Sequence, residues 1–494
     1  MALKYKIVAI FLLGCITQYN SHAQAKDALD SAIQKFSFTS PMVHASWGLS
    51  VIDMSDGSVY RSFNDHLSLM PASTLKTFTS AAALSLMGED FRFKTTFAYS
   101  GSVDSAGVLN GNIYIIGGGD PTFGSWRFGG ETYMDTIWHR TYRSLRELGI
   151  TTVVGRVIAD ASIFEYMTVP PSWQWEDMGN YYGTGVAGLS IHENSVRYVF
   201  RPAKRIGDPA QLIRTEPEIP YLEVVNNVTT NRKWSGDQVY VYGSPYSNLR
   251  FLTGTVPYGP AEFMVSGSIP DPAFFAATQF SNFLNSKGME VLFAPTTLLQ
   301  MEWMGAYERN VRKPIYVHYS PPLKQIVYYV NMNSNNMYAE ALVKMCGHHA
   351  KKEGTTSAGV EVVQEFWRKK GVNLSGLNQK DGSGLSRKNI ITPRILTETL
   401  YRIKDEQCFD ILYESLPVAG VSGSVKNMFK KSSAEGNMRA KSGTISGVKA
   451  YTGYLTNAGG KKLAFALIVN NYDGKHSEMV KLMEELLIAV SNSD

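Results

Sequence analysis

The spacing of hydrophobic residues differs between the two ends of the chain and the long region between them. Near the N-terminus, DALDSAIQKFSF has the periodicity of a helix, and ASWGLSVIDMSDGSVYRSFND alternates around an Asp56-Gly57 turn, which predicts a β-hairpin. A second helix is predicted to begin near Pro71, in PASTLKTFTSAAALSLMG. The next two hundred or so residues consist of short β-branched and aromatic runs separated by Gly, Pro and Asn clusters. Such a pattern of residues favours a β-rich region.

The last third of the chain returns to a mixed pattern. NMYAEALVKMCG predicts a helix that ends at a Gly cap, and NMRAKSGTISGVKAYTGYL and KKLAFALIVNNY predict neighbouring antiparallel strands closed by a helix in SEMVKLMEELLIAVSN. These elements need the N-terminal hairpin and helix to complete one packed domain. We therefore predict an α/β (α+β) domain from residues 26–92 and 301–494, interrupted by a β-rich insertion of two sub-domains at residues 93–300.

The first 25 residues have the pattern of an export signal. MALKYK supplies a positive start, IVAIFLLGCIT a short apolar core, and SHAQA a small-residue cleavage region ending at Ala23 or Ala25. The apolar run is shorter than the roughly 20 residues that a membrane-spanning helix requires. The segment LLGC, whose last residue is Cys15, loosely matches a lipoprotein signal. Lipidation of Cys15 is therefore the alternative to cleavage after Ala23 or Ala25. Either pathway predicts a protein outside the cytoplasm, and we expect a periplasmic location.

Composition and charge exclude several classes of protein. The chain has 494 residues, 44% hydrophobic and 18% charged, with a net charge of +5, which describes a folded protein of two to three domains. The sequence contains no Lys/Arg-rich run with interleaved aromatic residues, the pattern that would predict nucleic-acid binding. Beyond the signal only Cys346 and Cys408 remain, and we expect them to be core residues. His348 and His349 lie beside lysines, and no Cys/His spacing predicts a metal or other cofactor.

Three short motifs occur in a fixed order along the chain. A Ser-x-x-Lys motif comes first, a Ser-x-Asn motif second and a Lys-Ser-Gly motif third; they occupy Ser73 to Lys76, Ser334 to Asn336 and Lys441 to Gly443. Each motif alone is weak. Each motif lies on a predicted helix or strand that can present its side chains. The occurrence of all three together therefore indicates one active site.

Ser73 and Lys76 have the spacing of a nucleophile and its base. Residues three apart lie on one face of a helix, so the lysine amine can reach the serine hydroxyl. Burial and a nearby positive charge, here Lys441, lower the pKa of a lysine and make its neutral form accessible. A neutral Lys76 can then accept the hydroxyl proton as Ser73 attacks a carbonyl carbon.

The remaining motif residues fit the recognition of a peptide with a free carboxylate. The backbone N–H groups of Ser73 and Thr444 are expected to bind the developing oxyanion, and Gly443 allows close approach of substrate at a strand edge. Lys441 and the Thr444 hydroxyl are expected to hold the carboxylate. Ser334 can relay a proton to the leaving amine, and Asn336 can bind a substrate amide.

Simpler explanations exist for each motif taken alone. Ser73 and Ser334 could be helix N-caps, Lys76 a surface lysine, and Lys441-Ser442-Gly443 a strand-end turn. No G-x-S-x-G nucleophile elbow occurs in the sequence. The DGSGLS segment from Asp381 fits a tight turn, in which Ser383 at most supports the site.

S-T-L-K, S-N-N and K-S-G-T resemble the active-site motifs of the serine penicillin-recognising enzymes. More specifically, the chain resembles the class C low-molecular-mass penicillin-binding proteins, the D-alanyl-D-alanine carboxypeptidase/endopeptidase family. GGGDPTF, LTGTVPYG, DGSGLSRKN, LPVAGVSGSVKNMF and RAKSGTISGVKAYTGYL also resemble family segments. The long interval between the first two motifs agrees with the family's insertion.

The resemblance implies a transpeptidase-like domain, with helices on a five-stranded antiparallel sheet, and the removal of terminal D-Ala from peptidoglycan stem peptides. It makes Ser73 the acyl-enzyme nucleophile, Lys76 its base, and Ser334, Asn336 and Lys441 the supporting set, with β-lactams as covalent inhibitors. Ser442 stands where many relatives have Thr. Cleavage of D,D cross-links, oligomeric state and the diamino acid of the stem peptide stay open. The alternatives are a β-lactamase or esterase on the same fold, and a non-catalytic peptidoglycan-binding module.

Overall fold

A five-stranded sheet unites the two ends of the chain. The computed structural model describes residues 28–307 and 310–494, so the predicted signal segment 1–25 lies outside the described residues. Each pair of neighbouring strands in this sheet is antiparallel, in the order β18-β19-β20-β1-β2. The predicted fold class is thereby confirmed. The strands are β1 (Ser46–Asp53), β2 (Val59–Phe63), β18 (Arg439–Ile445), β19 (Val448–Thr456) and β20 (Lys462–Asn470).

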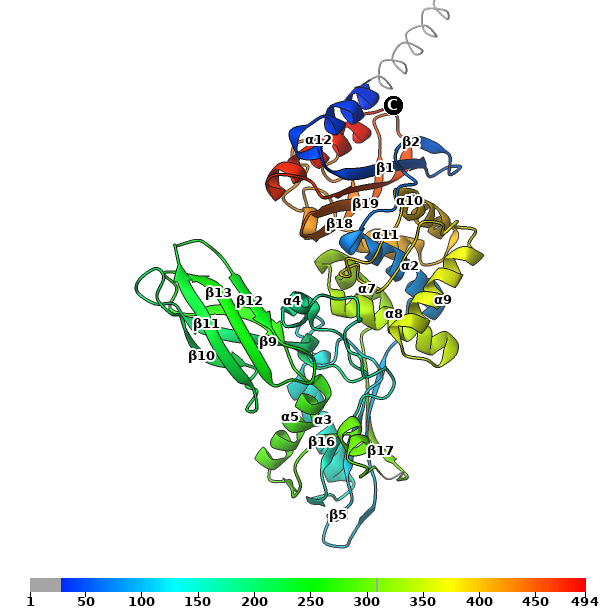
Figure 1. The fold of residues 1–494 in the computed structure, drawn as a ribbon. Coiled ribbons are helices and arrows are strands. Elements are labelled where there is room, and N and C mark those ends of the chain that lie inside the picture. The colour runs from blue at the N-terminus through cyan, green and yellow to red at the C-terminus, as the bar shows by residue number, and fades with distance from the viewer. Residues whose placement is uncertain (1–27, 308–309) are drawn as a thin grey trace, which may run out of the picture.

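Helices cover both faces of this sheet, as Figure 1 shows. Strand β20 explains why, because its side chains alternate between two apolar cores. Leu463, Phe465 and Leu467 pack with α12 (His476–Ser491) and with the helical residues 28–37. The intervening residues of β20, which include two alanines, face the opposite helical layer. Their small side chains allow those helices to lie close to the sheet.

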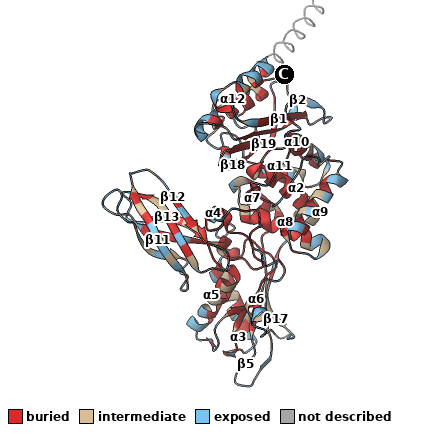
Figure 2. Ribbon diagram, in the orientation of Figure 1, coloured by how far each residue is buried: buried red, intermediate tan, exposed pale blue. Residues whose placement is uncertain are grey.

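The second helical layer contains Lys76 and Asn336, and Ser73 and Ser334 lie at the ends of its helices. Its central helix, α2, is buried from Leu75 through Leu84, and Figure 2 shows the neighbouring helices buried where they face it. A helix that is buried on every side is enclosed by the helices around it. The helices of this layer are α2 (Leu75–Met87), α7 (Leu323–Asn333), α8 (Asn336–Lys351), α9 (Thr356–Lys369), α10 (Pro393–Arg402) and α11 (Phe409–Ser415).

The inserted region begins directly after α2 and contains two small mixed sheets. Their orders are β16-β8-β6-β3-β17 and β15-β7-β5-β4. Strand β17 pairs with β3, so the first sheet includes a strand from beyond residue 300. The strands are β3 (Lys94–Tyr99), β4 (Ser102–Val103), β5 (Val108–Asn110), β6 (Ile113–Ile116), β7 (Thr152–Val154), β8 (Val157–Asp160), β15 (Glu290–Val291), β16 (Thr296–Thr297) and β17 (Lys313–Tyr319).

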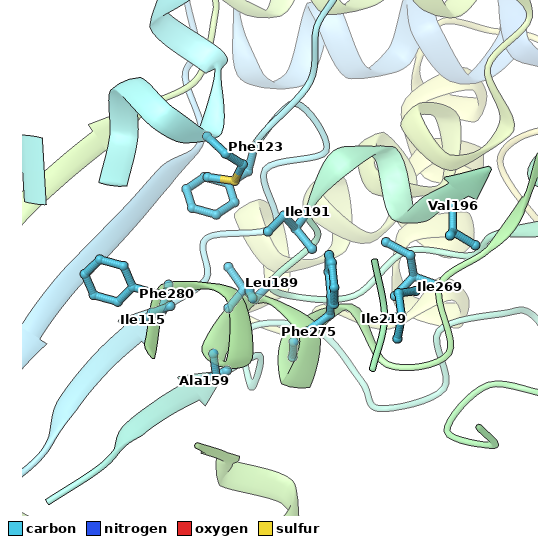
Figure 3. Packing of buried hydrophobic residues seen from close by; sticks show 14 of the residues in the cluster. Ile115, Phe123, Ala159, Leu189, Ile191, Val196, Ile219, Ile269, Phe275 and Phe280 are labelled. Atoms are coloured by element: carbon cyan, nitrogen blue, oxygen red, sulfur yellow. The ribbon is translucent and has the colours of Figure 1, made fainter. Parts of the chain in front are cut away.

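Two three-stranded sheets project sideways from this region (Figure 1). One apolar core joins them to α3 (Met134–Glu147) and α5 (Pro272–Ser286), and Figure 3 shows Phe123, Leu189 and Phe275 within it. The remaining elements are β9 (Ser195–Arg201), β10 (Gln211–Glu216), β11 (Glu223–Asn231), β12 (Gln238–Tyr242), β13 (Leu249–Pro257), β14 (Phe263–Ser268), α4 (Trp175–Met178) and α6 (Leu298–Trp303).

The structure corrects the predicted end of α8. The helix continues through Gly347 to Lys351, and Lys352 ends it in a left-handed conformation with φ +62°. A Cβ atom at Gly347 would lie 2.7 Å from the backbone nitrogen of Gly359 in α9. Gly347 therefore allows two helices to pack closely and does not act as a cap.

Candidate active site

Ser73 lies in a 3-10 turn, η2 (Ala72–Thr74), that leads directly into α2. Neither η2 nor α2 has a side-chain cap, so the N-cap explanation of Ser73 is wrong. Ala72, the residue before it, has a φ of +46°, a region that residues with a Cβ rarely occupy. Strained backbone of this kind is frequent at active sites, where the surrounding structure fixes it.

Lys76 is fully buried, and its amine is directed at Ser73. Its Nζ atom lies 2.9 Å from Ser73 Oγ, 2.6 Å from Asn336 Oδ1 and 2.7 Å from the carbonyl oxygen of Ser383. Burial lowers the pKa of Lys76 to about 7, against the opposing influence of Asp381 and Glu340. The surface-lysine explanation is therefore wrong, and the neutral amine is well populated near pH 7.

The cause of the lowered pKa differs in part from the predicted one. We expected burial and the charge of Lys441 to act together on Lys76, and burial is the cause found. The charge of Lys76 instead acts on Lys441. The pKa of Lys441 lies well below its usual range because of burial and, in addition, the charges of Lys76 and Lys449. Two buried amines that repel each other favour a state in which at least one is neutral.

Two buried carboxylates hold the loop that contacts Lys76. Asp381 accepts hydrogen bonds from the backbone N–H groups of Gly384 and Ser386 and from the side chains of Asn389 and Trp173. Trp173 belongs to the inserted region, so this region helps to position the loop. The DGSGLS segment bends at residues 382–384, and it supplies the Ser383 carbonyl to Lys76.

Glu340, on α8, is the second of these carboxylates. It accepts hydrogen bonds from the backbone N–H groups of Gly382 and Ser383 at 3.1 and 2.8 Å. Burial and the neighbouring Asp381 raise the pKa of Glu340 to about 7. Glu340 and Asp381 also raise the pKa of Lys76, against the effect of its burial.

Ser334 and Asn336 lie at the junction of α7 and α8. Ser334 has a left-handed conformation with φ +58° and ends α7, while Asn335 caps α8 by accepting from the N–H of Tyr338. The N-cap explanation of Ser334 is therefore wrong. The hydroxyl of Ser334 accepts a hydrogen bond from Lys441 at 2.9 Å, and Asn336 Nδ2 donates to the Tyr182 carbonyl.

Lys441, Ser442, Gly443 and Thr444 lie within strand β18, so the strand-end-turn explanation is wrong. Strand β18 is at the sheet edge nearest to η2. A Cβ atom at Gly443 would lie 3.0 Å from the backbone nitrogen of Ser73 and 2.6 Å from the Pro71 carbonyl oxygen. Only glycine permits this approach, which brings the strand edge to the nucleophile.

The side chains that flank Gly443 have separate partners. The hydroxyls of Ser442 and Ser424 are 2.7 Å apart, and Lys449 donates to the Thr444 hydroxyl at 2.9 Å. Burial lowers the pKa of Lys449 to about 8. Lys441 and Lys449 thus place two amines beside the strand edge where a substrate carboxylate is expected.

The structure brings all eight predicted site residues into one region, and it adds residues that sequence reasoning missed. Ser73, Lys76, Ser334 and Lys441 form hydrogen-bonded pairs, and Asn336 bonds to Lys76. The missed residues are Glu340, Asp381, Trp173, Ser424 and Lys449. A signal existed for Glu340, because it lies one helical turn after Asn336 as the one carboxylate among the apolar residues of α8.

Among residues 28–307 and 310–494, no group of three or more His, Cys, Asp and Glu side chains is arranged to hold a metal ion. Cys346 and Cys408 are buried, as predicted, and neither forms a disulfide. Cys15 lies outside the described residues. Within the described part of the chain, no helix has both the length and the hydropathy of a bilayer span.

The site contains the groups that a serine-type acyl-transferring hydrolase requires, a serine hydroxyl beside a buried amine. The family model described as the D-Ala-D-Ala carboxypeptidase 3 (S13) family matches residues 27–488. A D-alanyl-D-alanine carboxypeptidase of Actinomadura sp. is 30% identical over 439 residues, covering 86% of this chain and 78% of that protein. The chain belongs to the D-Ala-D-Ala carboxypeptidase 3 (S13) family.

Two further relatives extend the comparison. The D-alanyl-D-alanine carboxypeptidase DacB of Haemophilus influenzae is 24% identical over 434 residues, covering 86% of this chain and 85% of that protein. The crystal structure of penicillin binding protein 4 (dacB) from the same organism has a TM-score of 0.79 at 22% identity, covering 93% of this chain and 99% of that one. The predicted family and fold are confirmed.

Proposed function

We propose that the protein is a serine D,D-peptidase that removes the terminal D-Ala from peptidoglycan stem peptides through an acyl-enzyme. The observation that carries the proposal is the fully buried Lys76 amine, 2.9 Å from Ser73 Oγ, with a pKa of about 7. A base of this pKa at hydrogen-bonding distance matches the requirement for activating a serine near neutral pH.

Acylation begins with proton transfer from Ser73 Oγ to Lys76 Nζ. As the Oγ–C bond forms at the penultimate D-Ala carbonyl, the negative charge on its oxygen is held by the N–H groups of Ser73 and Thr444. The C–N bond then breaks, and the leaving amine takes the proton that Lys76 received from Ser73, relayed through the hydrogen-bonded Ser334 and Lys441, so that Lys76 is neutral again. In the second half Lys76 accepts a proton from the water that attacks the ester carbonyl. It returns this proton to Ser73 Oγ as the ester C–O bond breaks, which releases the shortened peptide and restores Ser73.

Substrate recognition in this proposal depends on the edge of β18. Lys441, the Thr444 hydroxyl and the adjacent Ser442 bind the C-terminal carboxylate, while Gly443 admits the substrate backbone. Asn336 keeps one N–H of its amide for the substrate, because the other donates to Tyr182. A cross-link presents the same scissile bond with a different leaving amine, so endopeptidase activity uses the same steps.

The domain division and the location of the protein are further parts of the proposal. Residues 26–92 and 301–494 carry the catalytic groups, and the insertion at residues 93–300 supports them through Trp173. The signal pattern at residues 1–25 supports a periplasmic protein. The N-terminus of the exported protein, determined by mass spectrometry, separates cleavage after Ala23 or Ala25 from lipidation at Cys15.

The direct test compares two serine variants on α2 and its leading turn. Ser73→Ala should abolish D-Ala release from a synthetic D-Ala-D-Ala peptide. Ser80→Ala, which removes a buried hydroxyl that has no hydrogen-bond partner within the described residues, should retain it. D-Ala release that survives Ser73→Ala would contradict the proposal. Rapid turnover of a cephalosporin without peptide hydrolysis would favour the β-lactamase alternative.

A further inference from the structure

The sheet β11-β13-β12 of the inserted region has one face in the protein core and one face in solvent. Val239, Val241 and Leu252 lie in the core, and the residues between them point to the opposite face. Figure 2 shows buried and exposed residues alternating along these strands. We name the solvent-facing positions the outer face: 225, 227 and 229 in β11, 238, 240 and 242 in β12, and 251, 253 and 255 in β13.

The outer face is aromatic and polar, and none of its positions carries a charged residue. Its aromatic and hydrogen-bonding members include Tyr240, Tyr242, Phe251, Asn227, Gln238 and Thr253. Tyr240 is 49% exposed and Phe251 is 40% exposed. Exposed aromatic side chains that gather on one surface mark a binding site more often than rings that are scattered singly.

The aromatic rings form a strip that begins at α4. The ring centroids of Trp175 and Tyr242 are 6.3 Å apart, and those of Tyr242 and Tyr240 are 6.4 Å apart, with an angle of 30° between the ring planes in each pair. Phe251 is the cross-strand partner of Tyr242 on the same face. Because cross-strand partners lie about 5 Å apart, these side chains together cover a continuous apolar area.

The next row across the sheet supplies hydrogen-bonding groups. Asn227, Thr253 and Tyr240 are register partners on adjacent strands. Their amide, hydroxyl and phenol groups can each donate and accept hydrogen bonds without carrying a charge. A saccharide ring has an apolar face of C–H groups and a rim of hydroxyl and acetamido groups. The apolar strip and the polar row match these two parts of a saccharide.

The lack of charge separates the possible partners of the outer face. A nucleic acid or another polyanion requires Lys or Arg side chains that neutralise its charges. An anionic membrane surface requires the same cations. The outer face has neither Lys nor Arg, and it has no carboxylate for a basic partner. A neutral saccharide chain requires no charge and is therefore the best complement.

The segment that follows Trp175 connects the outer face with the active site. It leads to Tyr182, whose carbonyl oxygen accepts a hydrogen bond from Asn336 at 2.8 Å. Within this segment, Asn180 accepts a hydrogen bond from the backbone N–H of Val241 at 3.1 Å, which ties the segment to β12. We propose that the outer face binds the neutral, β-linked N-acetylhexosamine chain to which stem peptides are attached. The choice of this polymer rests on the proposed D,D-peptidase function.

The first test uses the full protein and a soluble probe, the β-1,4-linked tetramer of N-acetylglucosamine. Isothermal titration calorimetry should show binding with a dissociation constant on the order of 1 mM or below. Since no charged group of the outer face takes part, the dissociation constant should stay the same when the salt concentration is raised.

Variants of two aromatic residues locate the binding site. Tyr240→Ala and Phe251→Ala should each weaken binding of the tetramer about fivefold, because each change removes a ring from the platform. Tyr133→Ala changes a tyrosine that is 45% exposed and lies outside the outer face, so it should bind as the wild type does. All three variants should be acylated by a penicillin at the wild-type rate, which shows that they are folded.

A second measurement compares the polymer with a short substrate. For each variant, the rate of D-Ala release from intact peptidoglycan is divided by the rate from a soluble D-Ala-D-Ala peptide. This ratio should fall about threefold in Tyr240→Ala and stay unchanged in Tyr133→Ala. Both rates are measured on one preparation, so a partly folded variant changes them alike and leaves their ratio unaffected.

No binding at about 10 mM tetramer would overturn the inference, as would binding that neither Tyr240→Ala nor Phe251→Ala weakens. A dimer that Tyr240→Ala dissociates would assign the outer face to a second copy of the chain and would also overturn it. Hydrolysis of the soluble peptide without saccharide binding contradicts the outer-face site alone. Saccharide binding without hydrolysis or penicillin acylation contradicts the proposed function and supports the site.

Discussion

Lys76 Nζ lies 2.9 Å from Ser73 Oγ, and its two other partners fix the direction of this contact. The Ser383 carbonyl can only accept a hydrogen bond. Asn336 Oδ1 must accept as well, because the Asn336 Nδ2 group donates to the Tyr182 carbonyl. A neutral amine has two N–H donors and one lone pair, so both donors are used and the lone pair faces the Ser73 hydroxyl. Neutral Lys76 is thereby oriented as a base.

The rate of acylation should rise with pH through a value near 7. Lys76 accepts a proton only in its neutral form, and burial lowers the pKa of Lys76 to about 7. Below this pH the amine is protonated, and the rate should fall about tenfold per pH unit. Stopped-flow acylation by a penicillin between pH 5 and 9 measures this profile, and a rate that is flat through pH 7 would show that Lys76 is not the base.

Glu340→Gln should move the inflection of the same profile to lower pH. Glu340 is one of two carboxylates that stabilise protonated Lys76, so its neutralisation should lower the pKa of Lys76, by about half a unit. Glu361→Gln, an exposed change on α9, is the control that should leave the profile in place. An inflection that stays fixed or moves upward in Glu340→Gln contradicts this assignment.

Gly443→Ala should impair acylation far more than folding. The added methyl would lie 2.6 Å from the Pro71 carbonyl oxygen and 3.0 Å from the Ser73 nitrogen, and it would push the strand edge away from the nucleophile. A displacement of about 1 Å at a reacting group costs on the order of a hundredfold in rate. Gly130→Ala, whose new methyl meets nothing within 4 Å, should react normally. Near-normal acylation of Gly443→Ala would contradict the close approach.

Trp173→Phe tests the support that the inserted region gives to the catalytic loop. The change removes the indole N–H that donates to Asp381 at 2.9 Å while it keeps an aromatic ring. Loss of one donor to a buried carboxylate should lower the free energy of unfolding by about 1–2 kcal/mol and slow acylation. Trp175→Phe, at a tryptophan that is 53% exposed, is the matched control. Identical denaturation curves and rates for the two variants would exclude this role of Trp173.

The parts of the site that the sequence predicted are those with local patterns. Ser73 and Lys76 are one turn apart, and the continuous apolar run of β20, which is typical of a strand buried on both faces, is readable directly from KLAFALIVN. Glu340 and Asp381 could not be paired in advance, because their relation depends on the packing of α8 against a distant loop. The helix α3 was missed although its buried residues, such as Met134, Ile137 and Trp138, recur at helical spacing. It lies within a region whose short β-branched and aromatic runs favoured strands.

The most direct measurement of the central claim is the mass of the intact protein after incubation with a penicillin. Attack by Ser73 opens the β-lactam ring without releasing a fragment, so the protein should gain the full mass of one penicillin. The added mass should map to Ser73 within tryptic peptide 62–76. Adduct formation at another residue, or an unmodified protein beside unconsumed penicillin, would contradict the assignment of Ser73 as the nucleophile.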